Sequence, residues 1–173
     1  MNVSDWIIEY LEDYGVTHVF TVSGGGSIWL CDALARAKKI KYICCHHEQA
    51  AGYAAEGYAR ARNQLGVTLV TSGPGGTNAV SACAASWLDS VPHLFISGQA
   101  FLKHTIDGHP GLRQMGVQEI NIIDIVKPIT KYAMMMKDPQ ERHALVGAIT
   151  IATTPRMGPV WLDIPGDIQN SHI

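Results

Sequence analysis

The chain has 173 residues, of which 47% are hydrophobic and only 16% are charged, and its formal net charge is −2. This length fits one domain with a single buried core. The low share of charged residues predicts that a partner covers part of the surface, as in a homodimer or a higher homo-oligomer. The sequence lacks a basic stripe, which excludes the electrostatic footprint of a nucleic-acid partner.

No apolar run approaches the roughly 20 residues that span a bilayer, and the first residues lack the features of a secretion signal. We therefore expect no membrane association and a cytoplasmic location. The four cysteines stand in apolar strand-like or helix-like contexts, which predicts buried thiols rather than disulfides. No metal ligand is expected in the Cys-Cys-His-His run at 44–47, because neighbouring side chains of an extended segment point to opposite faces.

Apolar residues recur at helical or alternating spacing along the chain, which predicts helices and strands in alternation. The expected elements of the first half are a helix over residues 4–14 capped by Ser4, a strand over 18–22, a helix over 28–38, a buried strand over 40–45, a helix from Glu48 onward, a strand over 67–71 and a helix over 77–87. Those of the second half are a strand over 93–97, a short helix over 120–126, an extended stretch over 130–136, a helix over 138–152 and a strand over 160–164.

This alternation predicts an α/β fold with a mainly parallel sheet of about six strands and helices on both faces. Ligands of such sheets bind at the carboxyl ends of the strands. Residues 98–116 interrupt the alternation with a polar, glycine-rich segment, which is typical of a functional loop. We expect one domain over residues 1–166, with residues 167–173 starting an interdomain linker.

Glu48 stands between the predicted strand over 40–45 and the helix that follows it. Burial at such a strand end makes the charged form of a carboxylate costly, so this acid is expected to exchange a proton near neutral pH. Small residues cover every face of its helix. They are compatible with packing against the sheet and equally with a helix pair across a two-fold axis.

Three glycine-rich turns follow or border predicted strands, among them those at 24–26 and at 73–76. A helix that begins after such a turn offers free N–H groups to an anion. Neither turn has the lysine of the Walker pattern, and neither completes the spacing of a dinucleotide-binding fingerprint. From their residues alone, tight-turn geometry and ligand contact both remain open.

Many short segments, in this order and spacing, carry a family resemblance. They include HEQAA at 47–51, TSGPGGTN at 71–78, and the segments 14–20, 24–27, 57–60, 89–92, 97–99, 118–119, 127–131 and 158–165. The chain resembles the N-terminal, pyrimidine-binding domain of thiamine diphosphate enzymes of the acetolactate synthase group. That group includes acetohydroxyacid synthase, pyruvate oxidase and related decarboxylases. The resemblance covers nearly the whole chain.

The resemblance implies a set of site residues. In that family the glutamate matching Glu48 binds N1′ of the cofactor's aminopyrimidine and activates the cofactor as an acid and base. Gln118 matches a glutamine that reaches the reaction centre and is the second catalytic candidate. The implied cofactor-binding residues besides Glu48 are Gly73, Pro74, Thr77 and Asn78 around the pyrimidine, and Gly24, Gly25 and Gly26, which face the thiazolium and the substrate from the neighbouring subunit.

Two positions near the substrate depart from the family pattern. Val117 stands where the synthases commonly carry an aromatic residue, and Ser23 stands where they carry a proline. The expected reaction is therefore that of a 2-oxoacid decarboxylase or carboligase, acetolactate synthase-like, acting on a small 2-oxoacid. The alternatives are the small subunit of a two-subunit sulfopyruvate or phosphonopyruvate type decarboxylase, and a non-catalytic binding module of the same fold.

The family holds the diphosphate through Mg²⁺ on a separate domain, with a Gly-Asp-Gly motif followed by paired asparagines. This chain contains neither feature. The central and diphosphate-binding domains are therefore expected on the same polypeptide beyond this chain or on another chain. The isolated domain is expected to be inactive.

Overall fold

The structure is a computed structural model that describes residues 1–173. Its six strands form a single sheet in the order β2-β1-β3-β4-β6-β5, and every neighbouring pair is parallel. The strands are β1 (His18–Thr21), β2 (Lys41–Cys44), β3 (Gly66–Val70), β4 (His93–Gln99), β5 (Tyr132–Met135) and β6 (Pro159–Pro165). The predicted α/β fold with a parallel six-stranded sheet is confirmed.

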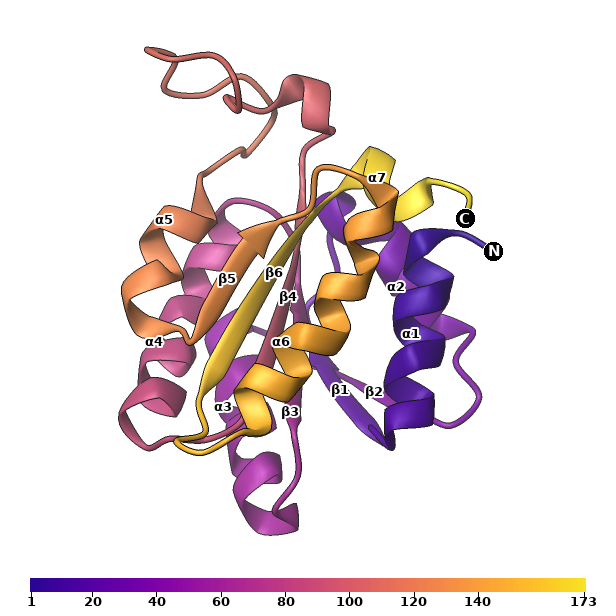
Figure 1. The fold of residues 1–173 in the computed structure, drawn as a ribbon, viewed down its shortest axis with the longest axis vertical. Helices are drawn as coiled ribbons and strands as arrows, with labels where there is room; N and C mark the ends of the chain where they lie inside the picture. The colour runs from indigo at the N-terminus through magenta and orange to yellow at the C-terminus, as the bar shows by residue number, and fades with distance from the viewer.

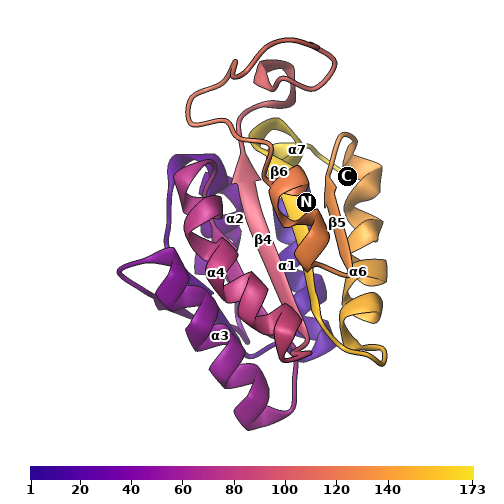
Figure 2. The ribbon, with the colours of Figure 1, turned by 90° about the vertical axis from the view of Figure 1, so that its left-hand side faces the viewer.

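Helices cover both faces of the sheet (Figures 1 and 2). One face packs against α1 (Val3–Tyr14), α2 (Ile28–Ala35) and α6 (Ala144–Thr153), and the other against α3 (Glu48–Arg62), α4 (Pro74–Leu88) and α5 (Ile122–Val126). Short 3₁₀ helices lie at Gly25–Ser27, Leu102–His104, Lys127–Ile129 and Pro139–His143, and α7 (Gly166–Asn170) is the last helix. None of the helices combines the length and the apolar character that a membrane crossing requires.

The central strands β3, β4 and β6 are buried at every position, as expected of parallel strands that are covered on both faces. Within them Phe95 stacks on Trp161 with 4.8 Å between the ring centroids. Since all strands run in one direction, their carboxyl ends meet at one edge of the sheet. That edge is where a ligand site is expected.

The strand predicted over 40–45 is present as β2, but the prediction that it is buried is wrong. The structure places β2 at the edge of the sheet, where all four of its residues are exposed in the single chain. An apolar run predicts a strand but does not show whether a neighbour covers it. Exposed Tyr42 and Ile43 therefore belong to an uncovered edge rather than to the core.

The cysteine prediction is confirmed in one part and wrong in another. All four thiols are free, but only Cys83 is buried. Cys44 is exposed because it ends the edge strand β2. Cys45, just after it, is half-buried, and so is Cys31 on α2. For Cys44, position at the edge of the sheet rather than local apolar context decides the exposure.

The small residues of α3 pack inside the domain along one face. Ala51, Gly52, Ala55 and Ala59 are buried there, and a side-chain carbon at Gly52 would lie 2.4 Å from Cβ of Ala82 on α4. A side-chain carbon at Gly66 on β3 would lie 2.6 Å from the carbonyl oxygen of Ala55, so the predicted packing of α3 against the sheet is confirmed. The opposite face of α3 is exposed in the single chain, and the helix pair across a two-fold axis stays a prediction.

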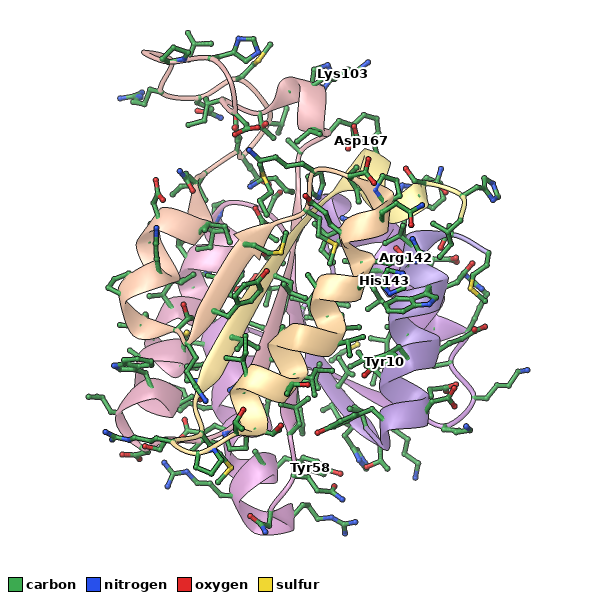
Figure 3. The ribbon with its side chains drawn as sticks, in the orientation of Figure 1. Tyr10, Tyr58, Lys103, Arg142, His143 and Asp167 are labelled. Carbon is green, nitrogen blue, oxygen red and sulfur yellow. The ribbon has the colours of Figure 1, made fainter.

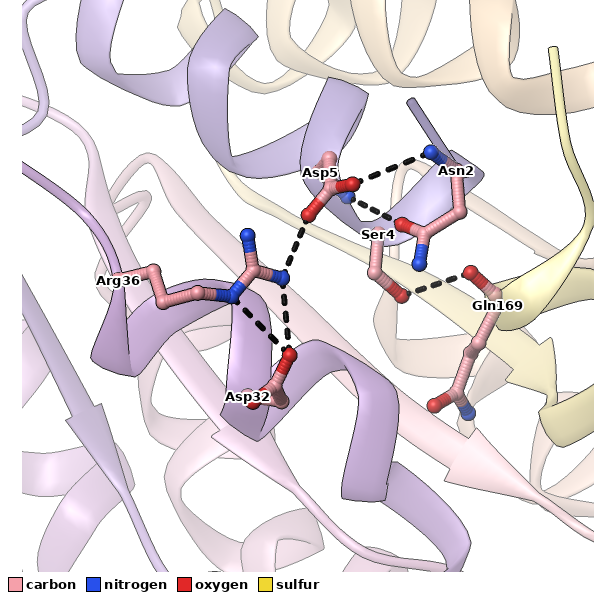
Figure 4. A network of polar contacts seen from close by, with 6 residues as sticks. All are labelled: Asn2, Ser4, Asp5, Asp32, Arg36 and Gln169. Atoms are coloured by element: carbon pink, nitrogen blue, oxygen red, sulfur yellow. Dashed lines mark hydrogen bonds and ion pairs between the residues drawn. The ribbon is translucent and has the colours of Figure 1, made fainter.

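The N-cap of helix α1 differs from the predicted one. Asn2, and not Ser4, is the N-cap: its side chain accepts a hydrogen bond from Asp5 N, and its own N–H donates to the Asp5 carboxylate (Figure 4). Ser4 lies inside the helix, where its hydroxyl donates to the carbonyl of Gln169 at 3.0 Å. Arg36 of the next helical segment also donates to Asp5. The hydrogen bond of Ser4 to Gln169 thus ties the start of α1 to the end of the chain.

The end of the chain packs on the domain. In α7, Gly166, Ile168 and Gln169 are buried, and His172 forms an antiparallel bridge with Asn2. The two termini consequently lie close together (Figure 1). The packed unit continues beyond the expected start of a linker at residue 167, while the boundary to a following domain stays a prediction.

A long loop, residues 100–120, stands above the carboxyl edge of the sheet (Figures 1 and 2). Strand β4 runs two residues further than predicted, to Gln99, before this loop begins. The first turn of the loop is held by α7, because the carboxylate of Asp167 accepts a hydrogen bond from Leu102 N at 2.9 Å. Figure 3 shows Asp167 near Lys103 at this end of the molecule, opposite Tyr58. The loop is therefore anchored where the site is expected.

Candidate functional site

Glu48 and Asn78 meet where helices α3 and α4 begin. Glu48 is the first residue of α3, and Asn78 lies one turn into α4. The side-chain amide of Asn78 donates to Glu48 Oε2 at 2.9 Å, whereas Glu48 Oε1 has no hydrogen-bond partner in the chain. The Glu48 residue is half-buried rather than buried. One carboxyl oxygen is thus held and the other is free for a ligand.

The first turn of α4 comes close to Glu48 because it carries glycine. A side-chain carbon at Gly75 would lie 3.4 Å from Glu48 Oε1 and 2.6 Å from Cγ2 of Thr71. The helix starts at Pro74, three residues earlier than predicted, because proline needs no N–H partner at the first helical position. Thr77 closes this turn by donating to the Pro74 carbonyl at 3.2 Å.

The first glycine turn, at 24–26, lies directly against Thr71 and Ser72, which precede the second. Gly26 N donates to Oγ1 of Thr71 at 3.0 Å. Side-chain carbons at Gly24 and Gly26 would lie 2.5 Å from Cβ of Thr71 and from Oγ of Ser72, respectively, whereas one at Gly25 would meet nothing within 4 Å. Contacts within the chain therefore account for glycine at 24 and 26. Ligand contact by the three glycines stays a prediction.

Gln118, near the end of the 100–120 loop, lies against Gly73 of the second glycine turn. Its φ is +54°, in the left-handed region, and a side-chain carbon at Gly73 would lie 2.1 Å from its carbonyl oxygen. The Gln118 side chain is exposed and makes no hydrogen bond within the chain. An open pocket of about 420 Å³ lies beside it, and its lining includes Gly25, Gly26, Ser72, Val117 and Gln118.

The structure therefore arranges the predicted site residues in two groups. Glu48 and Asn78 form one group at the start of α3 and α4, beside Gly75, which was not predicted, and the first glycine turn with Gln118 forms the other. Thr71 and Ser72, together with the second glycine turn that follows them, join the two groups, since these residues contact both. The sequence-based roles of these residues stay predictions.

Gly98 and Thr71 support the site but were not singled out from the sequence. A side-chain carbon at Gly98 would lie 2.0 Å from the carbonyl oxygen of Gly26, so β4 can pass this turn only with glycine there. The predicted strand ends at residue 97, but the structure places Gly98 inside β4, where a glycine signals such an approach. Thr71 has no comparable signal, because its partner Gly26 is 45 positions away.

A buried carboxyl group lies beneath the loop, at Asp163 on β6. Ser97 Oγ donates to its Oδ1 at 2.6 Å, and Gln99 Nε2 donates to its Oδ2 at 2.9 Å. Burial raises the pKa of Asp163 from its ordinary value of 3.8 to about 7, although the hydrogen bonds from Ser97 and Gln99 act to lower it. This carboxyl group is thus set to change its charge near neutral pH.

The raised pKa of Asp163 predicts a pH dependence of stability. Between pH 4 and 7 the folded state holds a proton at Asp163 that the unfolded state has released, so the free energy of unfolding falls as the pH rises. The slope from this group approaches roughly 1.4 kcal/mol per pH unit and vanishes above about pH 7. Urea unfolding of the wild type and of Asp163→Asn across this range measures it. An equal slope in both proteins would contradict the assignment.

Comparisons with known proteins show the family of the chain. Residues 1–125 match the family of the thiamine pyrophosphate enzyme, N-terminal TPP binding domain. An acetolactate synthase of Arthrospira platensis is 40% identical over 171 residues, which are 96% of this chain and 28% of that protein. Acetolactate synthase 2, chloroplastic, of Nicotiana tabacum is 41% identical over 174 residues, which are 98% of this chain and 25% of that protein.

The acetolactate synthase large subunit of Corynebacterium glutamicum is 39% identical over 168 residues, which are 96% of this chain and 26% of that protein. The chain thus spans about a quarter of the length of these curated relatives. It aligns with them over nearly all of its own length. The chain therefore belongs to the thiamine pyrophosphate enzymes, as an N-terminal TPP-binding domain homologous to acetolactate synthase large subunits.

Proposed function

We propose that this chain is the pyrimidine-binding half of a thiamine diphosphate-dependent 2-oxoacid decarboxylase or carboligase, akin to acetolactate synthase. Glu48 is the acid and base at N1′ of the cofactor's aminopyrimidine. The observation that carries the proposal is the contact of Asn78 with Glu48, 2.9 Å long, in a chain of this family. It holds one oxygen of the acid and leaves the other free.

The residues around Glu48 suit an aromatic ring that carries nitrogen. A carboxyl group can donate to such a nitrogen when protonated and accept from it when ionised. Glu48 Oε1 is free for this exchange, and Gly75 leaves the space beside it without a side chain. Exposed Pro74 offers an apolar surface to a ring, and Gly73 and Thr77 shape the turn that holds it. These residues therefore fit the pyrimidine.

When bound, thiamine diphosphate supplies the electron sink for breaking the bond between the carboxylate and the carbonyl carbon of a 2-oxoacid. The task of Glu48 is to hold and exchange a proton at Oε1, and the task of Asn78 is to keep the carboxyl group turned toward the ring. Gln118 and the first glycine turn stand beside the neighbouring pocket, where they would meet the substrate.

Other parts of the assembly complete the site in this proposal. The diphosphate and its Mg²⁺ ion bind to a diphosphate-binding domain, on the same polypeptide or on another chain. A homodimer or a higher homo-oligomer closes the site and removes water from the half-buried Glu48. A cytoplasmic location stays a prediction, since the tobacco relative is named chloroplastic.

Product analysis of the full-length protein tests the reaction. With thiamine diphosphate, Mg²⁺ and pyruvate we expect acetolactate, and with the isolated 173-residue chain we expect negligible turnover, because half of the cofactor contacts are missing. A panel of 2-oxoacids that includes sulfopyruvate and phosphonopyruvate separates the alternatives. Preference for either of these two substrates would favour the two-subunit decarboxylase. Robust turnover by the isolated chain, or none by the full-length protein, would contradict the proposal.

A further inference from the structure

Gln99 joins both ends of the 100–120 loop with one side chain. Its Oε1 accepts a hydrogen bond from the N–H of Ala100, the first residue of the loop, at 2.9 Å. Its Nε2 donates to the carbonyl of Ile120, the last residue of the loop, at 3.0 Å. Gln99 is buried, with 3% of its surface exposed. The Gln99 end of both bonds is therefore sheltered from water.

Asp163 supports the orientation of the Gln99 amide that the two loop ends require. Its Oδ2 accepts from Gln99 Nε2 at 2.9 Å, on the same nitrogen that donates to the Ile120 carbonyl. The other oxygen, Oδ1, accepts from Ser97 Oγ, which in turn accepts from Nε1 of Trp161 at 2.8 Å. A continuous set of hydrogen bonds thus leads from the buried core to the base of the loop.

The closed base sets the position of Gln118, which lies two residues before Ile120. Between them stands buried Glu119, whose Oε2 accepts hydrogen bonds from Met115 N at 2.8 Å and from Gly116 N at 3.0 Å. The last segment of the loop, residues 115–120, is therefore held rigid. A shift at Ile120 would be passed on to Gln118 rather than absorbed between them.

We propose that Gln99 is a positioning residue that closes the 100–120 loop on itself and thereby sets where Gln118 stands at the pocket. The part that Gln118 plays in turnover rests on the proposed function. The closure of the loop does not, because it follows from the contacts of Gln99 with Ala100 and Ile120.

Gln99→Met in the full-length protein tests this inference, because methionine has a similar volume and cannot make either hydrogen bond. Hydrogen–deuterium exchange of the backbone amides 101–119, followed by mass spectrometry, should quicken by roughly tenfold. In the same variant kcat should fall by roughly 10- to 100-fold with a smaller change in KM, since orientation rather than binding is lost. Gln99→Asn, too short to span both ends, gives the same test should Gln99→Met fail to fold.

Two variants serve as controls. Ser97→Ala removes a hydrogen bond from the same carboxyl group without touching the loop, so it should lower stability and leave loop exchange at the wild-type rate. Asp163→Asn can still turn an oxygen toward Gln99, so it should keep the loop closed. Wild-type loop exchange in Gln99→Met and Gln99→Asn would overturn the inference. Faster exchange with unchanged kcat would uphold the loop closure and refute the role of Gln118 in the proposed function.

Discussion

Replacing Glu48 with glutamine in the full-length protein is expected to slow the exchange of the thiazolium C2 hydrogen of bound thiamine diphosphate for deuterium by roughly 10²- to 10⁴-fold. Glutamine has the same size and its amide oxygen can still accept from Asn78, so the site should keep its shape. It cannot take up or release a proton at the position of Oε1. The loss therefore isolates proton exchange from binding. Quenched-flow deuterium exchange read by NMR measures the rate.

Glu9→Gln is the matched control for this substitution. Glu9 is exposed and has no hydrogen-bond partner, so its variant loses the same charge without touching the site. We expect wild-type C2 exchange from it. Thermal shift with thiamine diphosphate and Mg²⁺ shows whether Glu48→Gln still binds the cofactor. A cofactor-loaded Glu48→Gln protein with a wild-type exchange rate would show that this carboxyl group is not the acid and base.

Replacing Gly98 with alanine is expected to lower the free energy of unfolding by about 1–3 kcal/mol and to displace the first glycine turn. The added carbon would lie 2.0 Å from the carbonyl oxygen of Gly26, 2.3 Å from its carbonyl carbon and 2.6 Å from Ser27 N. All three are backbone atoms, which cannot rotate away as a side chain can. Strand β4 is held between β3 and β6, so the turn must move. Urea unfolding measures the loss.

Gly57→Ala separates this steric effect from the general effect of adding a methyl group. Gly57 is exposed on α3, and a side-chain carbon there would meet nothing within 4 Å. Alanine favours the helix, so this variant should gain about 0.5–1 kcal/mol. The displaced turn in Gly98→Ala should also lose the bond from Gly26 N to Thr71. Wild-type stability of Gly98→Ala would show that the close approach of β4 to this turn is wrong.

The sequence by itself determined the architecture of this protein. Apolar periodicity and the alternation of strands and helices predicted a six-stranded parallel α/β sheet, and the motif HEQAA placed Glu48 at the start of a helix. These features depend on contacts near in the chain, which local propensity reports. One error arose where distant parts of the chain decide, since β2 is an uncovered edge. The other error, the cap at Asn2 rather than Ser4, lay within local reach, because Asn2 and its partner Asp5 are three residues apart.

The tertiary structure alone decided how the site residues meet. Glu48 and Asn78 are 30 positions apart, Gly26 and Thr71 are 45 apart, and Gln99 and Asp163 are 64 apart. No local pattern encodes such pairs. They form because parallel strands bring the turns after β1, β2 and β3 and the ends of β4 and β6 to one edge of the sheet. At that edge the absence of a side chain at glycine lets the backbones approach, and the order of the strands determines which turns lie next to each other.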